Sequence, residues 1–278
     1  MATLFFNNTH VVPGSNNSRY QLQFTGGGIQ FKPGDKIGIQ QITIPYSWFN
    51  ITRAYNNNTF GYKLNGVTYT LTLPDGFYTL DDINNSFQGF MYANGHYLVD
   101  SGGNIWYPAQ LTTNITYYAI QYDAFVITPT LPTGYTNPAN VLYNSVTFSN
   151  PTTMQLVIPS NNFQSIVGYN AGIYPVNPQS TVYSCTGTFT PNLTPVNSVV
   201  IRCSLCRNNF ANPQDAFYSF SPNTSFGSNI NVMPTYPCWL DCASGSFPSI
   251  EIQFTDQNFV PIAMRDNNIC VQLLIKRD

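Results

Sequence analysis

The stretch FGYKLNGVTYTLTL, residues 60–73, decides the fold class. In its second half, Tyr69, Leu71 and Leu73 alternate with threonines, which is the period of a half-buried β-strand. Asn65-Gly66 stands between this run and the preceding one, and Asn-Gly is the strongest short signal for a β-hairpin turn. The stretch therefore predicts two antiparallel strands joined by a two-residue turn.

The same alternation recurs along the chain, so the hairpin is one of many strands. Further runs with apolar residues at every second position are Tyr118–Tyr122, Met154–Ile158, Ile250–Phe254 and Val271–Ile275. Ile37 and Ile39 are in phase with each other, but Ile42 and Ile44 have the opposite parity. A β-bulge near Gln40-Gln41 would reconcile the two pairs and bend the strand. The last two strands are expected to be joined by a loop over residues 256–268.

Composition supports an all-β protein. Only 8% of the residues are charged and 15% are aromatic, with 20 Pro and 19 Gly. Globular proteins average roughly 25% charged residues, and the Leu, Ala, Glu and Lys that cover ordinary helices are scarce here. Asn, Gly and Pro favour turns, whereas Tyr, Phe, Thr, Val and Ile favour strands. A helical bundle is excluded, and a βαβ repeat is disfavoured.

Two stretches have helical features. Thr79 is a good N-cap, and Asp81 and Asp82 follow it in the first turn, where acidic side chains interact favourably with the helix dipole. Asn94-Gly95 is a typical end for this helix. The apolar positions of its one face are Leu80, Ile83, Phe87, Phe90 and Met91. The second helix, one or two turns long, is expected within residues 162–168.

The charge pattern excludes several classes of partner. Ten Lys and Arg are spread over 278 residues and form no basic patch, so nucleic-acid binding is not expected. No run of 18 apolar residues predicts a membrane span, and the N-terminus lacks the positive region of a secretory signal. Protein interfaces are enriched in aromatic residues and depleted of Lys, Glu and Asp. Much of this surface is therefore predicted to be contact surface, and the alternative is an extracellular-type β domain with an Asn- and Thr-rich face.

The sequence offers little for catalysis, and we predict that the protein is not an enzyme. Its histidines and carboxylates are few, namely His10, His96, one glutamate, Glu251, and the aspartates. No motif for a nucleophile elbow, a zinc protease or a phosphate-binding loop occurs. Asp81 and Asp82 are adjacent, but the start of a helix explains them without chemistry. No cofactor is expected, apart from the metal considered next.

The six cysteines provide the strongest chemical signal. Cys203 and Cys206 form a C-x2-C pair, and Cys238 and Cys242 form a C-x3-C pair. Four thiolates at such spacings could hold a structural zinc ion. Two other interpretations stay open, namely one disulfide or small buried apolar residues. Cys185 and Cys270 are interpreted as core residues of strands.

Several segments resemble the minor capsid, or penton, proteins of virophages, polinton-like viruses and their giant-virus relatives. These segments are GIQQITIPYSWFNI (38–51), NTF (58–60), the hairpin at Asn65-Gly66, LPDGFYTLDDIN (73–84), FQSIVGY (163–169), VVIRCSL (199–205), IQFTDQ (252–257) and VQLLIKR (271–277). They are spread over most of the chain. The cysteine pairs are not part of this resemblance.

The resemblance implies a single jelly-roll β-sandwich over residues 1–278. It implies a homopentamer at the fivefold vertices of an icosahedral capsid, surrounded by a double-jelly-roll major capsid protein. The protein would be assembled in the host cell cytoplasm and located in the virion. A host receptor or a vertex spike is a further partner that such a protein could have. The alternative function is a jelly-roll module that binds glycans, as in a lectin or a fibre head.

Three finer expectations concern particular segments. Residues 1–17 are expected to be an N-terminal arm that orders on assembly, and residues 203–247 a loop insertion. Tyr46, Trp48 and Phe49 are expected to form a packing cluster at a contact surface, with burial in the core as the alternative for Trp48. No linker or charge-rich segment divides the chain, so one domain is predicted.

Overall fold

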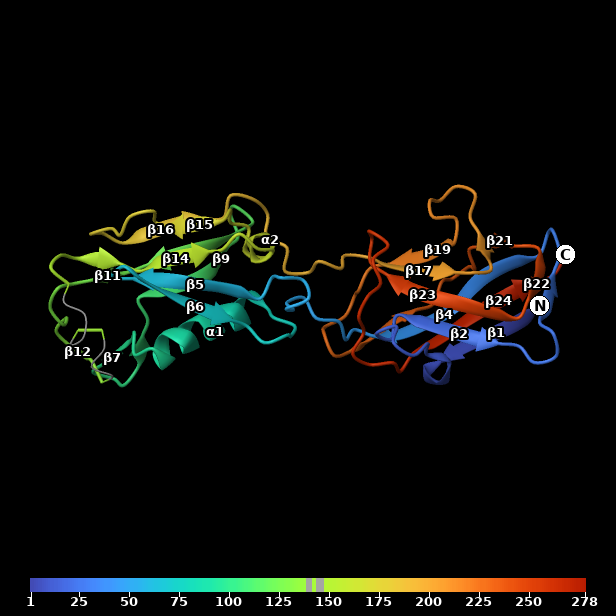
Figure 1. The fold of residues 1–278 in the computed structure, drawn as a ribbon, viewed down its shortest axis with the longest axis horizontal. Coiled ribbons are helices and arrows are strands. Elements are labelled where there is room, and N and C mark those ends of the chain that lie inside the picture. Colours follow the sequence, from blue (N-terminus) through green and yellow to red (C-terminus); the bar gives the residue numbers. More distant parts are fainter. Residues whose placement is uncertain (139–141, 144–147) are drawn as a thin grey trace. The chain divides into compact units, whose positions relative to one another are not determined.

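The computed structural model describes residues 1–138, 142–143 and 148–278, and most regular structure in them is β-strand. The chain forms two compact units, one of Met1–Phe49 with Val196–Asp278 and one of Asn50–Pro195 (Figure 1). The all-β prediction is confirmed, but the prediction of a single domain is wrong. The second unit is inserted into the first, and both share the same strand periodicity, so the hydrophobic pattern shows no boundary.

The first unit contains two sheets. One has the order β1 (Ala2–Asn7), β24 (Cys270–Lys276), β4 (Lys36–Pro45), β21 (Leu240–Cys242) and β18 (Cys206–Arg207), with β20 (Asn229–Val232) also paired to β4. The other has the order β19 (Ala216–Phe220), β17 (Val199–Cys203), β23 (Ser249–Thr255) and β2 (Arg19–Gln23). A small ribbon of β3 (Ile29–Phe31) and β22 (Gly245–Phe247) and the 3-10 helix η1 (Asn8–His10) complete the unit.

The strand pairing in this unit is that of a jelly roll. The first main strand pairs with the last (β1 with β24), and the second pairs with the last but one (β2 with β23). Inside them, β4 pairs with β20 and β21, and β17 pairs with β19. Such nested antiparallel pairs fold into the two sheets of a jelly roll. The jelly-roll prediction is therefore confirmed for the first unit, and the inserted unit lies in the connection between β4 and β17.

Each sheet of the jelly roll buries one face, as the alternation predicts. Buried side chains of the first sheet include Phe6, Ile37, Ile39, Ile42, Ile44, Val271, Leu273 and Ile275, and those of the second include Tyr20, Val199, Ile201, Ile250, Ile252 and Phe254. Burying each such side chain contributes roughly 1.5–3 kcal/mol relative to leaving it in water.

A β-bulge in β4 explains how its apolar residues before and after Gln40, which have opposite parity in the sequence, are buried on the same face of the strand. Gln272 pairs with Gln41, whereas the next residue of β24, Leu273, pairs with Ile39, so Gln40 is skipped. Gln40 is exposed, and Ile39 and Ile42 on either side are buried. The predicted bulge and the predicted loop between β23 and β24 are both confirmed.

Two of the finer expectations are wrong. Residues 1–17 are not an arm, because β1 pairs along its whole length with β24 and Phe6 is completely buried. The consecutive apolar residues Leu4, Phe5 and Phe6 hide the alternation of this strand. Residues 203–247 are not a loop insertion, because they contain strands of the jelly roll itself. Those strands are two to five residues long, which is too short for a clear period.

The inserted unit holds several small sheets and both α-helices. Its strands are β5 (Thr59–Leu64), β6 (Val67–Thr72), β7 (Leu98–Asp100), β8 (Ile105–Trp106), β9 (Ala109–Asn114), β10 (Ala119–Ala124), β11 (Val126–Ile127), β12 (Tyr135–Thr136), β13 (Thr152–Thr153), β14 (Gln155–Ile158), β15 (Gly172–Tyr174) and β16 (Tyr183–Thr186). The main sheets have the orders β15-β14-β5-β6 and β16-β10-β9. Smaller ones pair β7 with β8 and β12, and β11 with β13.

The predicted hairpin and helices are confirmed. Leu64 pairs with Val67, and Asn65 and Gly66 between them have positive φ angles of 47° and 82°, as a type I′ turn requires. Helix α1 (Leu80–Ala93) starts with a capping box between Thr79 and Asp82, and α2 (Phe163–Val167) ends at Gly168, which has a φ of 78°.

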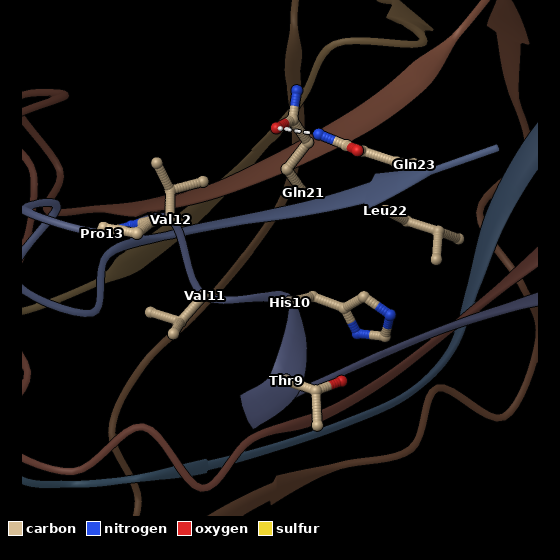
Figure 2. Close-up of a pocket in the computed structure, with 8 residues that line it drawn as sticks. All are labelled: Thr9, His10, Val11, Val12, Pro13, Gln21, Leu22 and Gln23. Atoms are coloured by element: carbon tan, nitrogen blue, oxygen red, sulfur yellow. Dashed lines mark hydrogen bonds between the residues drawn. The ribbon is translucent and has the colours of Figure 1, made fainter. Parts of the chain in front are cut away.

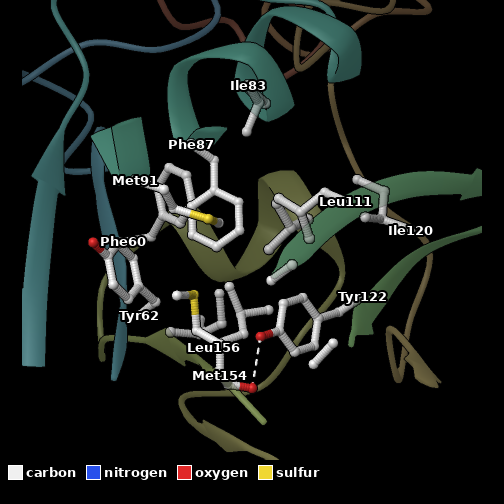
Figure 3. Close-up of a cluster of buried hydrophobic side chains, with 14 of the residues drawn as sticks. Phe60, Tyr62, Ile83, Phe87, Met91, Leu111, Ile120, Tyr122, Met154 and Leu156 are labelled. Atoms are coloured by element: carbon white, nitrogen blue, oxygen red, sulfur yellow. Dashed lines mark hydrogen bonds between the residues drawn. The ribbon is translucent and has the colours of Figure 1, made fainter. Parts of the chain in front are cut away.

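The core of the inserted unit lies between α1 and its strands (Figure 3). Ile83, Phe87 and Met91 of α1 are completely buried over the strands. The ring of Phe60 stacks on Phe163 at 4.4 Å between centroids and lies 5.5 Å from Phe87. No helix among the described residues is long and apolar enough to cross a bilayer.

Candidate functional surfaces

The acidic residues considered for chemistry have structural partners. Asp82 accepts hydrogen bonds from the Thr79 hydroxyl at 2.6 Å and from the Thr79 backbone N–H at 2.9 Å, and these bonds hold the pKa of its carboxyl below the usual value. Glu251 forms a two-pronged ion pair with Arg19, with distances of 2.7 and 2.9 Å. These contacts explain both carboxylates as a helix cap and a cross-strand pair.

The two histidines lie in separate places. His10 ends η1, where its Nδ1 accepts a hydrogen bond from the backbone N–H of Asn7 at 3.2 Å. His96 is buried in the inserted unit and shares a hydrogen bond of 2.7 Å with the Tyr62 hydroxyl. Among residues 1–138, 142–143 and 148–278, no three His, Cys, Asp or Glu side chains come together as a metal site.

The four zinc candidates have unlike surroundings. Cys206 on β18 lies directly opposite Cys242 on β21, so their side chains share one face of the sheet. Cys203 at the end of β17 is also buried, but Cys238 is exposed. All six cysteines are free thiols in the structure. The zinc hypothesis therefore gains no support from the geometry.

Burial also keeps three of these thiols unreactive. It raises the pKa of Cys203, Cys206 and Cys242 to about 12. Nucleophilic attack needs the thiolate, and in the absence of a metal these groups are thiols near pH 7. Cys203, Cys206 and Cys242 are therefore interpreted as small buried apolar residues.

The aromatic cluster predicted at a contact surface lies inside the first unit. Tyr46 and Trp48 are buried, with ring centroids 4.4 Å apart. Phe49 is half-buried, lies 6.3 Å from the ring of Phe226 and is covered by the guanidinium of Arg265 at 4.9 Å. The alternative of core burial is correct for Trp48, and Tyr46 is buried with it.

Large apolar side chains are exposed elsewhere in the chain, in both units. In the jelly roll they include Met1, Phe5, Phe210, Met233, Tyr236 and Val260, and in the inserted unit they include Ile115, Tyr117, Tyr118 and Val176. Ile115, Tyr117 and Tyr118 belong to one turn between β9 and β10, where the side chain of Asn114 accepts a hydrogen bond from the Tyr117 N–H. Exposed apolar groups gathered this closely are typical of interaction sites.

The jelly roll has two lateral edges. Terminal strands β1 and β2 lie in contact at one edge, and terminal strands β18 and β19 lie in contact at the other. β1 (ATLFFN) and β19 (AFYSF) carry no charged side chain. Soluble proteins usually protect a free strand edge with charges, proline or a bulge, because its unpaired backbone groups recruit other chains.

An open groove of about 470 Å³ lies at the β1–β2 edge (Figure 2). Val11, Val12 and Pro13 line one side of this groove, and Leu22 of β2 lies across from them. We call it the Val11–Leu22 groove. Val12 donates a backbone hydrogen bond of 2.9 Å to Arg19 O, so the outer side of β2 is paired only at its start in the described structure.

Phe210 stands on the opposite lateral edge, in the loop that joins β18 to β19. Its side chain is fully exposed, at 102%. Asn208 braces the loop, because its Oδ1 accepts from the Phe210 N–H at 3.2 Å and its Nδ2 donates to Ala216 O at 3.2 Å. Sequence reasoning missed both the groove and Phe210. The available signal was one aromatic residue within the Asn- and Pro-rich run NNFANP, 208–213.

No protein-family model matches the chain, and no curated protein matches its sequence. The chain resembles a virophage penton protein in structure. The similarity to the mavirus penton protein covers 100% of this chain and 98% of that chain, at 10% identity and a TM-score of 0.43. The similarity to a chain of the Sputnik virophage covers 99% and 97%, at 15% identity and a TM-score of 0.38.

Proposed function

We propose that this chain is a structural capsid protein, the penton subunit of a virophage-like virus, with five copies around each fivefold vertex. The jelly-roll pairing of the first unit supports a capsid shell role, and the sequence segments that resemble virophage and polinton-like pentons support the vertex. The chain acts by filling space and making contacts, without catalysis. The inserted unit is an addition to the shell domain.

The single observation that carries the proposal is the state of the two lateral edges. β1 and β19 end their sheets without a charged side chain or a proline, although β19 has a bulge at Phe217 where it pairs with β17. In a closed ring, one side of a subunit meets a different side of the next, so two unlike contact surfaces are needed. Two edges on opposite sides of one sandwich, each ending in a strand without charged side chains, meet this requirement.

The surface composition agrees with permanent contacts. Stable assemblies of this kind bury on the order of 2,000 Å² or more at an interface, and charged groups there would have to be desolvated. With 8% charged residues, this chain loses few hydration shells on assembly. Its exposed Phe5, Phe210 and Tyr236 offer large contact area with few rotatable bonds.

Two partners follow from the proposal. The outer faces of the ring contact a double-jelly-roll major capsid protein, and the pentamer is located at the capsid vertex after assembly in the host cytoplasm. The turn with Ile115, Tyr117 and Tyr118 belongs to the inserted unit and is available to a host receptor or a vertex spike. The glycan-binding function is the alternative that the same exposed tyrosines would serve.

The test combines purified chain with its major capsid protein and examines the product by electron cryomicroscopy. The proposal expects closed particles with density for five jelly rolls at each vertex, and open or vertex-deficient particles when the chain is omitted. Particles that close equally well without the chain would overturn the proposal. A glycan array on the chain alone, with selective binding lost in Tyr117→Ser, would favour the alternative.

A further inference from the structure

The jelly roll carries an exposed aromatic side chain on one lateral edge and an unfilled groove on the other. Phe210 lies in the loop that crosses from β18 to β19, and the Val11–Leu22 groove lies where the chain crosses from β1 to β2. We infer that Phe210 of one copy occupies the Val11–Leu22 groove of the next copy in the ring. This inference rests on the proposed function and names the contact that closes the ring.

The two surfaces match in chemistry. Residues 1–18 and residues 208–214 contain no Lys, Arg, Asp or Glu. Val11, Val12, Pro13 and Leu22 supply apolar walls for a phenyl ring. No charged side chain from either segment has to leave water when they meet, so the desolvation that weakens many polar contacts is small.

The groove is also large enough and incompletely covered. Its volume of about 470 Å³ admits an aromatic side chain with the residues beside it. Val11 and Val12 are half-buried in the single chain, so both can lose further surface to a neighbour. A phenylalanine buries about 150–250 Å² when it is covered, and Phe210 has its entire side chain left to bury.

Backbone N–H and C=O groups of β2 that face the groove can form hydrogen bonds with the loop that carries Phe210. The C=O of Arg19 points to the outer side of β2, where Val12 N–H reaches it. In an antiparallel strand every second residue points its N–H and C=O the same way, so those of Gln21 and Gln23 also face outward. The amides of Asn209 and Asn212, on either side of Phe210, bring donors and acceptors for these groups.

Hydrogen bonds within the single chain already hold the backbone of the loop that carries Phe210. The backbone N–H of Asn208 donates to Gln214 O at 2.8 Å, and the side chain of Asn208 holds both Phe210 and Ala216. A loop whose backbone is already held in place loses little backbone entropy on binding. Because the two surfaces differ and lie on opposite edges, the contact is heterologous and can close into a ring.

The first test compares the oligomeric state of the wild-type chain with that of Phe210→Ser. Tyr117→Ser is the matched control, since Tyr117 is an exposed aromatic residue of the inserted unit. We expect Phe210→Ser and a groove variant, Leu22→Asp, to dissociate at concentrations at least tenfold higher than wild type, with unchanged circular dichroism. Tyr117→Ser should assemble like wild type.

The second test traps the contact by cross-linking. Asn209→Cys, which keeps the ring of the neighbouring Phe210, and Gln23→Cys are combined in a Cys238→Ser background, which removes the one exposed native thiol. Mild oxidation should give a ladder of covalent species that ends at the pentamer, and each single-cysteine variant should give none. A wild-type ring that Phe210→Ser leaves intact and that yields no ladder would refute the contact but leave the proposed function standing. A wild-type chain that forms no ring would refute both.

Discussion

The hydroxyl of Tyr62 and the Nδ1 of His96 are joined by a hydrogen bond of 2.7 Å in the interior of the inserted unit. The His96 ring is 1% exposed, and it meets the rings of Tyr62 and Tyr69 edge to face, with centroids 5.6 and 4.8 Å away. Its backbone N–H donates to Met91 O at the end of α1, and its Nε2 has no hydrogen-bond partner among the described residues. The buried imidazole of His96 is therefore neutral in the folded protein.

This burial predicts a loss of stability in mild acid. It lowers the pKa of His96 from 6.5 to about 4. The unfolded chain then binds a proton between these values while the folded chain does not, so the free energy of unfolding falls as the pH falls from 6.5 to 4. The loss is about 3 kcal/mol. Hydrogen exchange of peptides from residues 59–72 at pH 7 and pH 4.5 measures it.

Two variants serve as controls for the acid effect. His96→Phe should lower stability at pH 7, because Tyr62 loses its partner, and should show little change between pH 7 and 4.5. His10→Gln, at the surface site in η1, should keep the wild-type pH dependence. If His96→Phe retained the full acid sensitivity, the effect would belong to other groups.

Asn50 ties the beginning of the inserted unit to its end. Its Nδ2 donates to Tyr78 O and to Leu193 O, and its Oδ1 accepts from the Tyr78 N–H, each at 2.8 Å. The side chain is 2% exposed, so Asn50→Ala leaves buried polar groups without partners. We expect a loss of about 3 kcal/mol in the free energy of unfolding, measured by urea denaturation. Asn85→Ala, on the exposed side of α1, should change it by less than about 0.5 kcal/mol.

The cysteines should differ sharply in reactivity. Cys238 is exposed, whereas burial raises the pKa of Cys203, Cys206 and Cys242 to about 12. At pH 8, a thiol reagent should label Cys238 first, and all six cysteines should react only after denaturation. Cys238→Ser should remove the fast phase. Rapid labelling of Cys206 or Cys242 in the native protein, or zinc at one ion per chain by elemental analysis, would contradict this assignment.

Local features were predictable because each depends on a few neighbouring residues. The hairpin at Asn65-Gly66, the cap at Thr79 and the bulge at Gln40 follow from turn chemistry, capping and parity. All three are properties of short segments, and all three hold in the structure.

The division into two units was not predictable in this way. The insertion begins after Phe49 and ends before Val196, and no change in composition marks either point. The pairing of β4 with β24, more than 200 residues later, is a long-range choice that no local pattern records. Phe210 was missed for a related reason, since an aromatic residue among asparagines reveals its exposure only when the strands on both sides are placed.

In the proposed assembly, copies of this chain cover each other's lateral edges in a ring of five. Mass photometry of the purified chain across a range of concentrations tests it most directly. The account predicts a dominant species of five times 31.0 kDa, about 155 kDa, that is lost in Phe210→Ser. A single species at 31.0 kDa at every concentration, also in the presence of the major capsid protein, would contradict it.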